Sequence, residues 1–235
     1  MLMKETGIAL IFARGGSKRI PDKNIKLFKA KPIISYPITT CLDAKIFDKV
    51  IVSTDSAKIQ TIAQSYGAET PFTRSEKSSN DNASTLDAII ESLELFEKEF
   101  QYLPQFLCLM YATSVFTDPT ELALAWKNFT ASNHDSLMTL AKHSSPPQRG
   151  LVVKNNHTEY WMEEQAQKRS QDLEEIYFDA AQYYMVRTEV ILKQKKFLTK
   201  NTGYNILPSM YVQDIDTTED WAIAEVKYEI KNNLR

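Results

Sequence analysis

Cysteine, histidine and long apolar runs are all scarce in this sequence of 235 residues. The two cysteines, Cys41 and Cys108, lie far apart and form neither a CxxC pair nor a zinc-binding spacing, so we expect buried free thiols. The three histidines are scattered and form no ligand pattern. No apolar run has the length of a membrane span or a secretory signal, which favours a cytoplasmic protein with no membrane partner.

The sequence also lacks a large excess of positive or negative residues, since the formal net charge is only −2. A chain without a basic excess has no general tendency to bind polyanions, so we do not expect a nucleic-acid partner. No Ser-His-Asp or Cys-His arrangement stands out, and covalent catalysis is not expected. The local exception is residues 14–23, which contain only one acidic residue but four cations, namely Arg14, Lys18, Arg19 and Lys23. This local excess indicates a small anionic ligand.

Strand and helix patterns alternate over the first 130 residues. The alternation predicts an α/β fold, with a Rossmann-like and mainly parallel sheet that carries helices on both faces. The chain length suits one domain over residues 1–235. Ile- and Val-rich runs predict strands at 7–13, 49–54 and 106–112. Helical patterns cover 32–47, 56–67, 84–100 and 117–129.

The pattern becomes less regular after residue 141. A breaker-rich connection leads to a hairpin predicted around Asn155 and Asn156. Further strands are predicted at 180–186 and from residue 211, followed by a helix capped by Thr217 and Asp220. We expect residues 142–178, approximately, to leave the main sheet as a smaller arm.

The cation-rich loop reads "FARGGSKRIPDKN" over residues 12–24 and directly follows the first predicted strand. In doubly wound sheets, ligands bind beyond the carboxyl ends of the strands. Glycines such as Gly15 and Gly16 let backbone N–H groups approach phosphate oxygens, and cations neutralise the phosphate charge. The loop matches neither GxGxxG nor the Walker A pattern. The alternative interpretation is a solvated basic turn.

"ARGGSKRIPDKN", followed by "KPIISYPI", resembles the nucleotide-binding signature of the CMP-sugar synthetases, the acylneuraminate cytidylyltransferases. Further matches at "IVSTDS", "TRSEKSSNDNAST", "YATSVF" and "DIDTTEDW" extend the resemblance over nearly the whole chain. Residues 168–184 are most similar to the branch that acts on pseudaminic acid. These enzymes join CTP to a nonulosonic acid and release pyrophosphate, so the resemblance implies these two substrates, Mg²⁺ as cofactor, and a homodimer formed through the arm.

The resemblance also implies a set of nucleotide-binding residues. Arg14 and Lys23 would act in catalysis together with Asp216. For the loop at 73–85, the alternative is an exposed connection capped by Ser84. With the role that the resemblance implies for Arg74 and Ser75, Asp81 is expected to hold this loop in shape. The positions that match the nucleotide contacts of the family are Arg14, Gly15, Ser17, Lys18, Lys23, Asn24, Arg74 and Ser75.

The sugar-binding positions are carried over from the same family. Relatives that act on sialic acid have Gln-Pro where this chain has Tyr111 and Ala112, which favours a different nonulosonic acid. Arg169 and Gln171 could instead belong to an ordinary arm segment with exposed charges. The expected sugar-binding residues are Thr113, Ser114, Arg169, Gln171, Asp179, Gln182 and Tyr183.

Asp214 and Asp216 form the candidate metal site. In an extended segment, residues i and i+2 face the same side, so both carboxylates could reach one cation. Carboxylate oxygens suit Mg²⁺, which also binds phosphates directly. The alternative makes Asp216 a cap for the following helix.

The favoured function is therefore a cytidylyltransferase acting on CTP and pseudaminic acid. One alternative is a synthetase for N-acetylneuraminic, legionaminic or 3-deoxy-octulosonic acid. Another is a nucleotide-binding regulatory protein without turnover, although the presence of Lys23 and the two aspartates argues against it.

Overall fold

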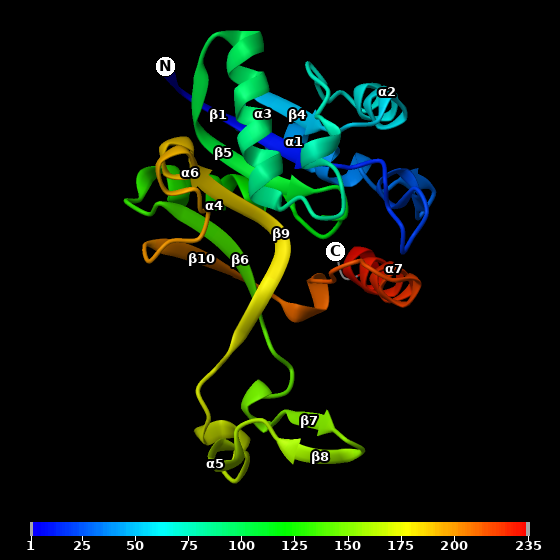
Figure 1. Cartoon of the computed structure of the whole chain (residues 1–235), viewed down its shortest axis with the longest axis vertical. Helices are drawn as coiled ribbons and strands as arrows, with labels where there is room; N and C mark the ends of the chain where they lie inside the picture. The colour runs from blue at the N-terminus through cyan, green and yellow to red at the C-terminus, as the bar shows by residue number, and fades with distance from the viewer. Residues whose placement is uncertain (1, 234–235) are drawn as a thin grey trace.

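A six-stranded sheet forms the centre of the body in the computed structural model, which describes residues 2–233 (Figure 1). Its strand order is β10-β6-β9-β5-β1-β4. Strand β9 runs antiparallel to β5 and β6, whereas the other neighbouring strands run parallel, so the sheet is mixed but mainly parallel. The strands are β1 (Met3–Phe12), β4 (Lys49–Ser53), β5 (Leu103–Tyr111), β6 (Ser136–Lys142), β9 (Tyr177–Arg187) and β10 (Thr202–Leu207).

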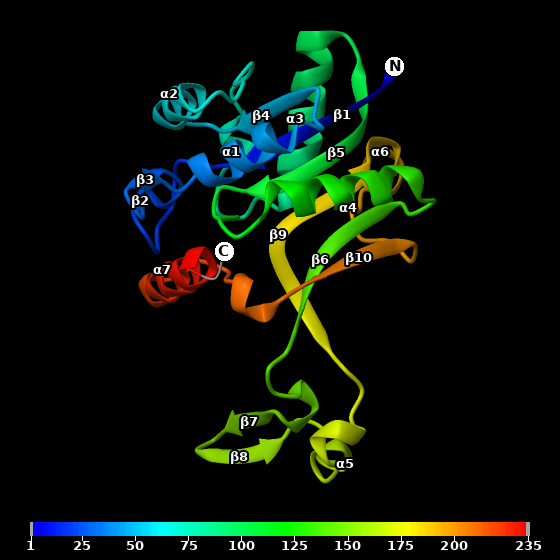
Figure 2. The ribbon, with the colours of Figure 1, turned by 180° about the vertical axis from the view of Figure 1, so that it is seen from behind.

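Helices cover both faces of this sheet (Figure 2). Helices α1 (Ser35–Ala44), α2 (Ala57–Ser65) and α4 (Pro119–Ala131) cover one face, and α3 (Thr85–Phe100) and α6 (Thr188–Gln194) cover the other. Helix α7 (Thr218–Asn233) packs beside the short pair β2 (Leu27–Phe28) and β3 (Lys31–Pro32). The Rossmann-like α/β prediction is therefore confirmed. No helix between residues 2 and 233 is both long and apolar enough to cross a bilayer.

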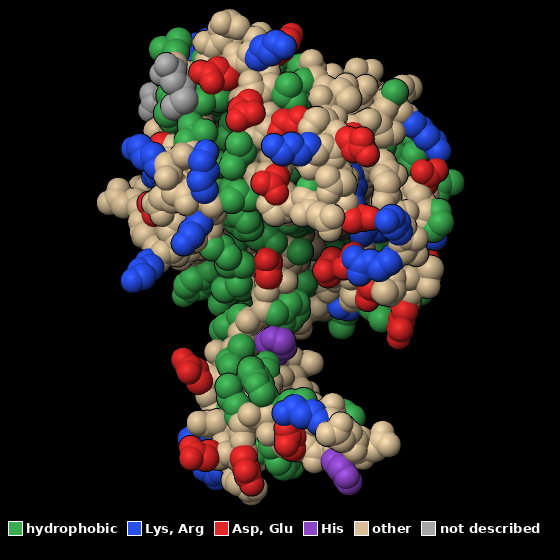
Figure 3. All heavy atoms as spheres, viewed as in Figure 1, with side chains coloured by type: hydrophobic (Ala, Val, Ile, Leu, Met, Phe, Trp, Pro, Cys, Tyr) green, Lys and Arg blue, Asp and Glu red, His purple; other side chains and the backbone are tan. Residues whose placement is uncertain are grey.

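An arm projects from the body on the ends of β6 and β9 and joins it through a narrow neck (Figure 3). It contains strands β7 (Leu151–Lys154) and β8 (His157–Tyr160) and the short helix α5 (Glu163–Ala166). Asn155 and Asn156 join the two strands with φ values of 49° and 63°. Asparagine tolerates this left-handed conformation, and two such residues make the turn favoured in two-residue hairpins. The predicted hairpin is confirmed.

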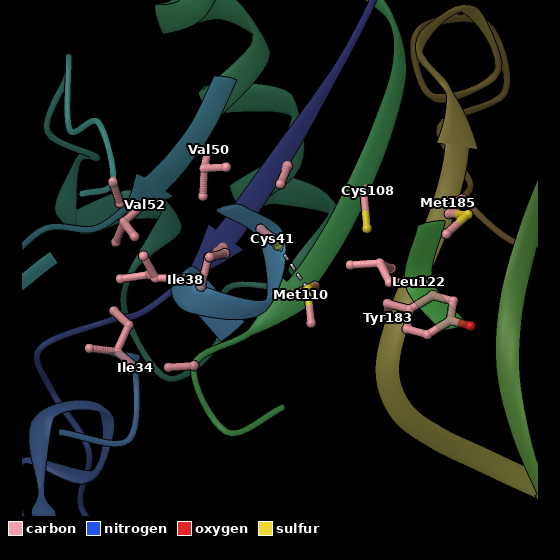
Figure 4. Packing of buried hydrophobic residues seen from close by; sticks show 14 of the residues in the cluster. Ile34, Ile38, Cys41, Val50, Val52, Cys108, Met110, Leu122, Tyr183 and Met185 are labelled. Atoms are coloured by element: carbon pink, nitrogen blue, oxygen red, sulfur yellow. Dashed lines mark hydrogen bonds between the residues drawn. The ribbon is translucent and has the colours of Figure 1, made fainter. Parts of the chain in front are cut away.

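The alternating side chains of β1 and β5 divide the buried core between the two faces of the sheet. Ala9 and Ile11 of β1, with Cys108 and Met110 of β5, face α1 and α4. Figure 4 shows this side of the core, where Cys41 of α1 approaches Met110. The intervening residues face α3 and α6. Both cysteines are buried and free, as the sequence predicted.

Local signals account for where several helices begin. Ser84 and Asp87 form a reciprocal capping box at the start of α3. Asp118 accepts the backbone N–H groups of the first turn of α4, where Pro119 needs no hydrogen-bond partner. Helix α1 begins at Ser35, so Pro37 lies in its first turn and does not interrupt the helix.

The prediction of a strand from residue 211 is wrong. Residues 212–216 are irregular because side chains satisfy their backbone groups. Lys227 Nζ donates to the Val212 carbonyl at 2.6 Å, Lys23 Nζ donates to the Ile215 carbonyl at 2.6 Å, and Asp220 accepts the Asp216 N–H at 3.1 Å. The strands β6 and β10 and the helix α6 were not predicted, nor were the short elements β2, β3 and α5.

Candidate active site

A cavity of about 560 Å³ lies at the carboxyl ends of β1 and β5. Parallel strands end at the same edge of a sheet, so loops distant in sequence meet there. Five segments line the cavity, and they lie around residues 12–24, 74–88, 111–113, 179–184 and 214–216. Of the residues predicted from the sequence, those that line it are Arg14, Ser17, Lys18, Lys23, Asn24, Arg74, Thr113, Asp179, Asp214 and Asp216.

Two hydrogen bonds fix the path of the loop after β1. The Gly15 N–H donates to Asp55 Oδ1 at 2.8 Å, and the Asn24 side chain donates to the Arg14 carbonyl at 2.8 Å. A Cβ at Gly15 would lie 3.1 Å from Cβ of Ser56, so the backbone needs a small residue there. Gly15 and Asn24, both predicted to contact nucleotide, thus also determine the loop's shape. The sequence analysis did not identify Asp55 in this role.

The cations of this loop are paired with two aspartates. Arg14 Nη1 lies 2.8 Å from Asp81 Oδ1, and Lys18 pairs with the other oxygen of the same carboxylate. Lys23 Nζ lies 3.1 Å from Asp216 Oδ1, and the Arg19 guanidinium lies 2.9 Å from the same oxygen. Arg19, which matches none of the nucleotide-binding positions implied by the resemblance, also lines the cavity. The basic loop is therefore directed into a site and is not a freely solvated turn.

Arg74 contributes a fifth cation from the loop before α3. It is almost fully buried, its Nε donates to Ser79 Oγ at 3.2 Å, and its guanidinium lies 5.8 Å from the ring centre of Phe12. Burial lowers the pKa of Arg74 from its ordinary value. Ser75 does not share this position. Its N–H donates to Glu91 Oε1 at 2.9 Å, and it is absent from the described lining of the cavity.

Asp214 and Asp216 both line the cavity, next to the cations. Burial raises the pKa of Asp214, and the neighbouring charge of Asp216 raises it further. Asp216 is not the helix cap, because Thr217 and Asp220 cap α7 reciprocally with bonds of 2.8 and 3.2 Å. The cap predicted for Thr217 and Asp220 is confirmed.

This pair of carboxylates fits a Mg²⁺ ion held with phosphates. Residues 2–233 contain no cluster of three or more His, Cys, Asp or Glu side chains arranged for a metal. Mg²⁺ needs no such cluster, because it keeps several waters and binds one or two carboxylates together with substrate phosphates. Asp214 and Asp216 would supply those carboxylates, and they line the same cavity as the cations of the β1 loop.

Two tyrosines, one from the end of β5 and one from β9, form one wall of the cavity. The rings of Tyr111 and Tyr184 meet edge to face, with 6.1 Å between their centres. The Tyr184 hydroxyl donates to Asp179 Oδ2 at 2.7 Å, while Asp179 Oδ1 accepts the Ala181 N–H at 2.9 Å. Ala181 has a φ of 51°, so the strand is distorted here. The sequence analysis did not assign Tyr184 to the site.

Three predicted sugar-binding residues lie outside the cavity. Ser114 Oγ accepts the Tyr111 N–H at 3.3 Å, and Gln182 Oε1 accepts the Phe116 N–H at 3.3 Å. Tyr183 is fully buried on the opposite face of the sheet (Figure 4), where its hydroxyl donates to Glu121 at 2.9 Å. The expectation that Tyr183 lines the site is corrected, because its ring packs in the core behind the sheet.

Arg169 and Gln171 also lie outside the cavity of their own chain. Both are exposed on the arm, and Arg169 Nε pairs with Asp172 at 2.7 Å. Within one chain, both residues therefore match the alternative interpretation, in which they belong to an ordinary arm segment with exposed charges.

A mainly parallel α/β sheet with a cation-lined cavity at its carboxyl edge is an arrangement typical of nucleotide-binding enzymes, and the comparison with known families narrows the class to the nucleotidyltransferases. The family model described as cytidylyltransferase matches residues 8–232, and the chain belongs to that family. It is 33% identical over 226 residues to the pseudaminic acid cytidylyltransferase of Campylobacter jejuni strain 81-176, covering 96% of this chain and 97% of that protein.

Other relatives are named after different sugar acids. The CMP-N,N'-diacetyllegionaminic acid synthase of Legionella pneumophila is 30% identical over 232 residues, covering 95% of this chain and 96% of that protein. Among solved structures, a CMP:2-keto-3-deoxy-manno-octonic acid synthetase complexed with CTP has a TM-score of 0.70 at 14% identity. That comparison covers 97% of this chain and 99% of the other, and it shows a shared fold.

Replacing Lys23 by alanine should lower turnover about ten- to thousandfold, because it removes a cation placed to stabilise charge on the transferred phosphate. Lys23 Nζ also donates to the Ile215 carbonyl and to Asp216, so the melting temperature should fall as well, and turnover is compared on variant protein shown to be folded. Lys58→Ala is the matched control, since Lys58 pairs with Asp22 outside the cavity. Steady-state kinetics at saturating substrates provide the measurement. Near-normal turnover of Lys23→Ala would refute this role.

Proposed function

We propose that this protein transfers CMP from CTP to the anomeric hydroxyl of a nonulosonic acid, releasing pyrophosphate, and that pseudaminic acid is the acceptor. The observation that carries the proposal is that a cation-rich loop and a pair of tyrosines with a carboxylate line one cavity. Arg14, Lys18 and Lys23 approach it from the β1 loop, while Tyr111 and Asp179 line the side below β5 and β9. The volume of about 560 Å³ lies within the range of small-molecule binding sites.

The reaction requires the acceptor hydroxyl to approach the α-phosphorus of CTP opposite the leaving pyrophosphate. Catalysis of this kind depends mostly on positioning and charge neutralisation. Arg14 and Lys18 would neutralise the triphosphate, and Lys23 would orient its reacting end near Asp216. Mg²⁺, held by Asp214 and Asp216, would supply further positive charge on the phosphates. Thr113 and Asp179 lie where they could hydrogen-bond the polar groups of the acceptor.

Pseudaminic acid is preferred among the candidate acceptors for two reasons. The named relatives at 33–34% identity over 96% of this chain act on it. The wall formed by Tyr111 and Tyr184 also offers aromatic surface together with the Asp179 carboxylate. Such a surface suits a sugar that carries acylamino groups, whose methyls can pack against rings and whose N–H groups can donate to a carboxylate. It therefore favours pseudaminic acid over 3-deoxy-octulosonic acid, and the named relatives favour it over the other acylamino sugars.

Pyrophosphate release with CTP, Mg²⁺ and a panel of acceptors tests the proposal directly. The panel contains pseudaminic, N,N'-diacetyllegionaminic, N-acetylneuraminic and 3-deoxy-octulosonic acids. We expect the highest kcat/KM with pseudaminic acid. Higher kcat/KM with another member would reassign the acceptor while keeping the reaction. A protein that binds CTP but releases no pyrophosphate with any acid would instead be a regulatory nucleotide-binding protein.

Asp216→Asn should reduce turnover by at least about 100-fold, because it removes a charge that orients both Lys23 and the metal. EDTA should inhibit the unmodified protein, and added Mg²⁺ should restore it. The control is Asp22→Asn, which removes an exposed carboxylate that pairs with Lys58, and it should keep full activity. Activity that survives both EDTA and Asp216→Asn would exclude the proposed metal role.

We further propose that two copies of the chain associate through the arm. Leu151, Val153 and Trp161 expose 58%, 72% and 58% of their surface, which is unusual for such apolar side chains near one another.

Val153→Asp should shift the protein toward the monomer in analytical ultracentrifugation. His157→Asp is the control, because His157 pairs with Lys154 and so lies on the other face of the hairpin. A monomeric unmodified protein, or equal effects of both variants, would contradict the proposal.

A further inference from the structure

The cations that would bind the triphosphate already have an anionic partner within the chain. Arg14 Nη1 lies 2.8 Å from Asp81 Oδ1, and Lys18 pairs with Asp81 Oδ2, so each carboxylate oxygen takes one cation. Asp81 comes from the loop before α3, 67 residues from Arg14, and it lines the same cavity. A carboxylate bridging two cations occupies them as a phosphate group would.

The loop that carries Asp81 does not need this carboxylate for its shape. Asn80 Oδ1 accepts the N–H groups of Asn82 and Ala83 at 2.9 and 3.1 Å, and Asn80 Nδ2 donates to the Glu76 and Lys77 carbonyls. Within residues 2–233, the Asp81 side chain forms hydrogen bonds and ion pairs with Arg14 and Lys18 alone. The sequence-based expectation that Asp81 holds the loop in shape is therefore replaced, since Asn80 performs that role.

The contact is strong enough to orient the cations and weak enough to exchange. The Asp81 side chain is 42% exposed, and those of Arg14 and Lys18 are 37% and 80% exposed. Ion pairs at such exposure contribute little stability, because water and salt screen them. A polyphosphate brings more negative charge and more acceptor oxygens than one carboxylate, so it can displace Asp81 from both cations.

We propose that Asp81 is an internal substitute for phosphate, which holds Arg14 and Lys18 in the ligand-free site and competes with every polyphosphate for them. The competition weakens the binding of CTP and also of the product pyrophosphate, so it favours product release. This inference rests on the proposed function, because that function supplies the triphosphate and the pyrophosphate. In this role Asp81 is a positioning residue that acts through Arg14 and Lys18.

Calorimetric titration of the whole chain with CTP, and separately with inorganic pyrophosphate, tests the proposal. Asp81→Asn keeps the size of the side chain but removes its charge. It should lower the Kd of both ligands about two- to fivefold, the range expected when a competing exposed ion pair is removed. Pyrophosphate should also become a stronger inhibitor of turnover. Asp81→Glu restores the charge and should return both Kd values toward those of the unmodified protein.

Other outcomes would overturn the proposal in distinguishable ways. Weaker binding of both ligands to Asp81→Asn would mean that Asp81 only keeps the cations in place. Weaker binding of CTP with unchanged pyrophosphate affinity would mean that Asp81 contacts the nucleoside. Unchanged affinity for both would exclude competition. Asp81→Ser must change both Kd values in the same direction as Asp81→Asn, and melting temperatures verify that each variant is folded.

The proposed function is judged separately, from pyrophosphate release by the unmodified protein. If that protein binds both ligands but releases no pyrophosphate with any acceptor, the proposed reaction fails while the competition can still be measured. If it binds neither ligand, both proposals fail.

Discussion

The contact between Lys23 and residues 215–216 joins the two ends of the chain around the site. Lys23 Nζ donates to the Ile215 carbonyl at 2.6 Å and to Asp216 at 3.1 Å, across 192 and 193 residues of sequence. A buried cluster behind it, which includes Ile20, Ile215 and Trp221, packs α7 against the segment after β1. Because of this packing, the cation loop and the two aspartates face one cavity.

Aspartates compensate much of the positive charge in that cavity. Arg14 and Lys18 share Asp81, while Arg19 and Lys23 share Asp216. Five cations directed at one space would otherwise repel one another. The two aspartates nevertheless differ, because Asp216 lies near Asp214 in the candidate metal site, whereas Asp81 stands on the separate loop before α3. The proposed triphosphate binding, metal binding and release of pyrophosphate all depend on this arrangement.

Strand β9 separates the acceptor side of the cavity from the core behind it. The pairing of β9 with β6 is irregular, since Met138 pairs with Tyr184 but Leu140 pairs with Asp179. Extra residues of β9 lie between these pairs, and Ala181 adopts a left-handed conformation there. The distortion directs Tyr184 and Asp179 into the cavity and leaves Tyr183 in the core. A regular strand would have grouped Asp179 with Tyr183, as simple alternation suggests.

Local sequence alone determined the elements whose signals are complete within a few residues. These include the buried strands β1, β4 and β5, the capping box at Ser84, and the hairpin turn at Asn155 and Asn156. The cation loop was also evident, because its composition contrasts with the rest of the chain. Strands β6 and β10 were not predicted because they mix polar with apolar residues. Their stability depends on strand pairing, since β6 pairs with β9 and β10 pairs with β6. Only the tertiary structure decided which tyrosine of β9 lines the cavity, because that outcome depends on a distortion of the strand. It also decided which aspartate pairs with which cation, because those pairs join loops that lie far apart in sequence.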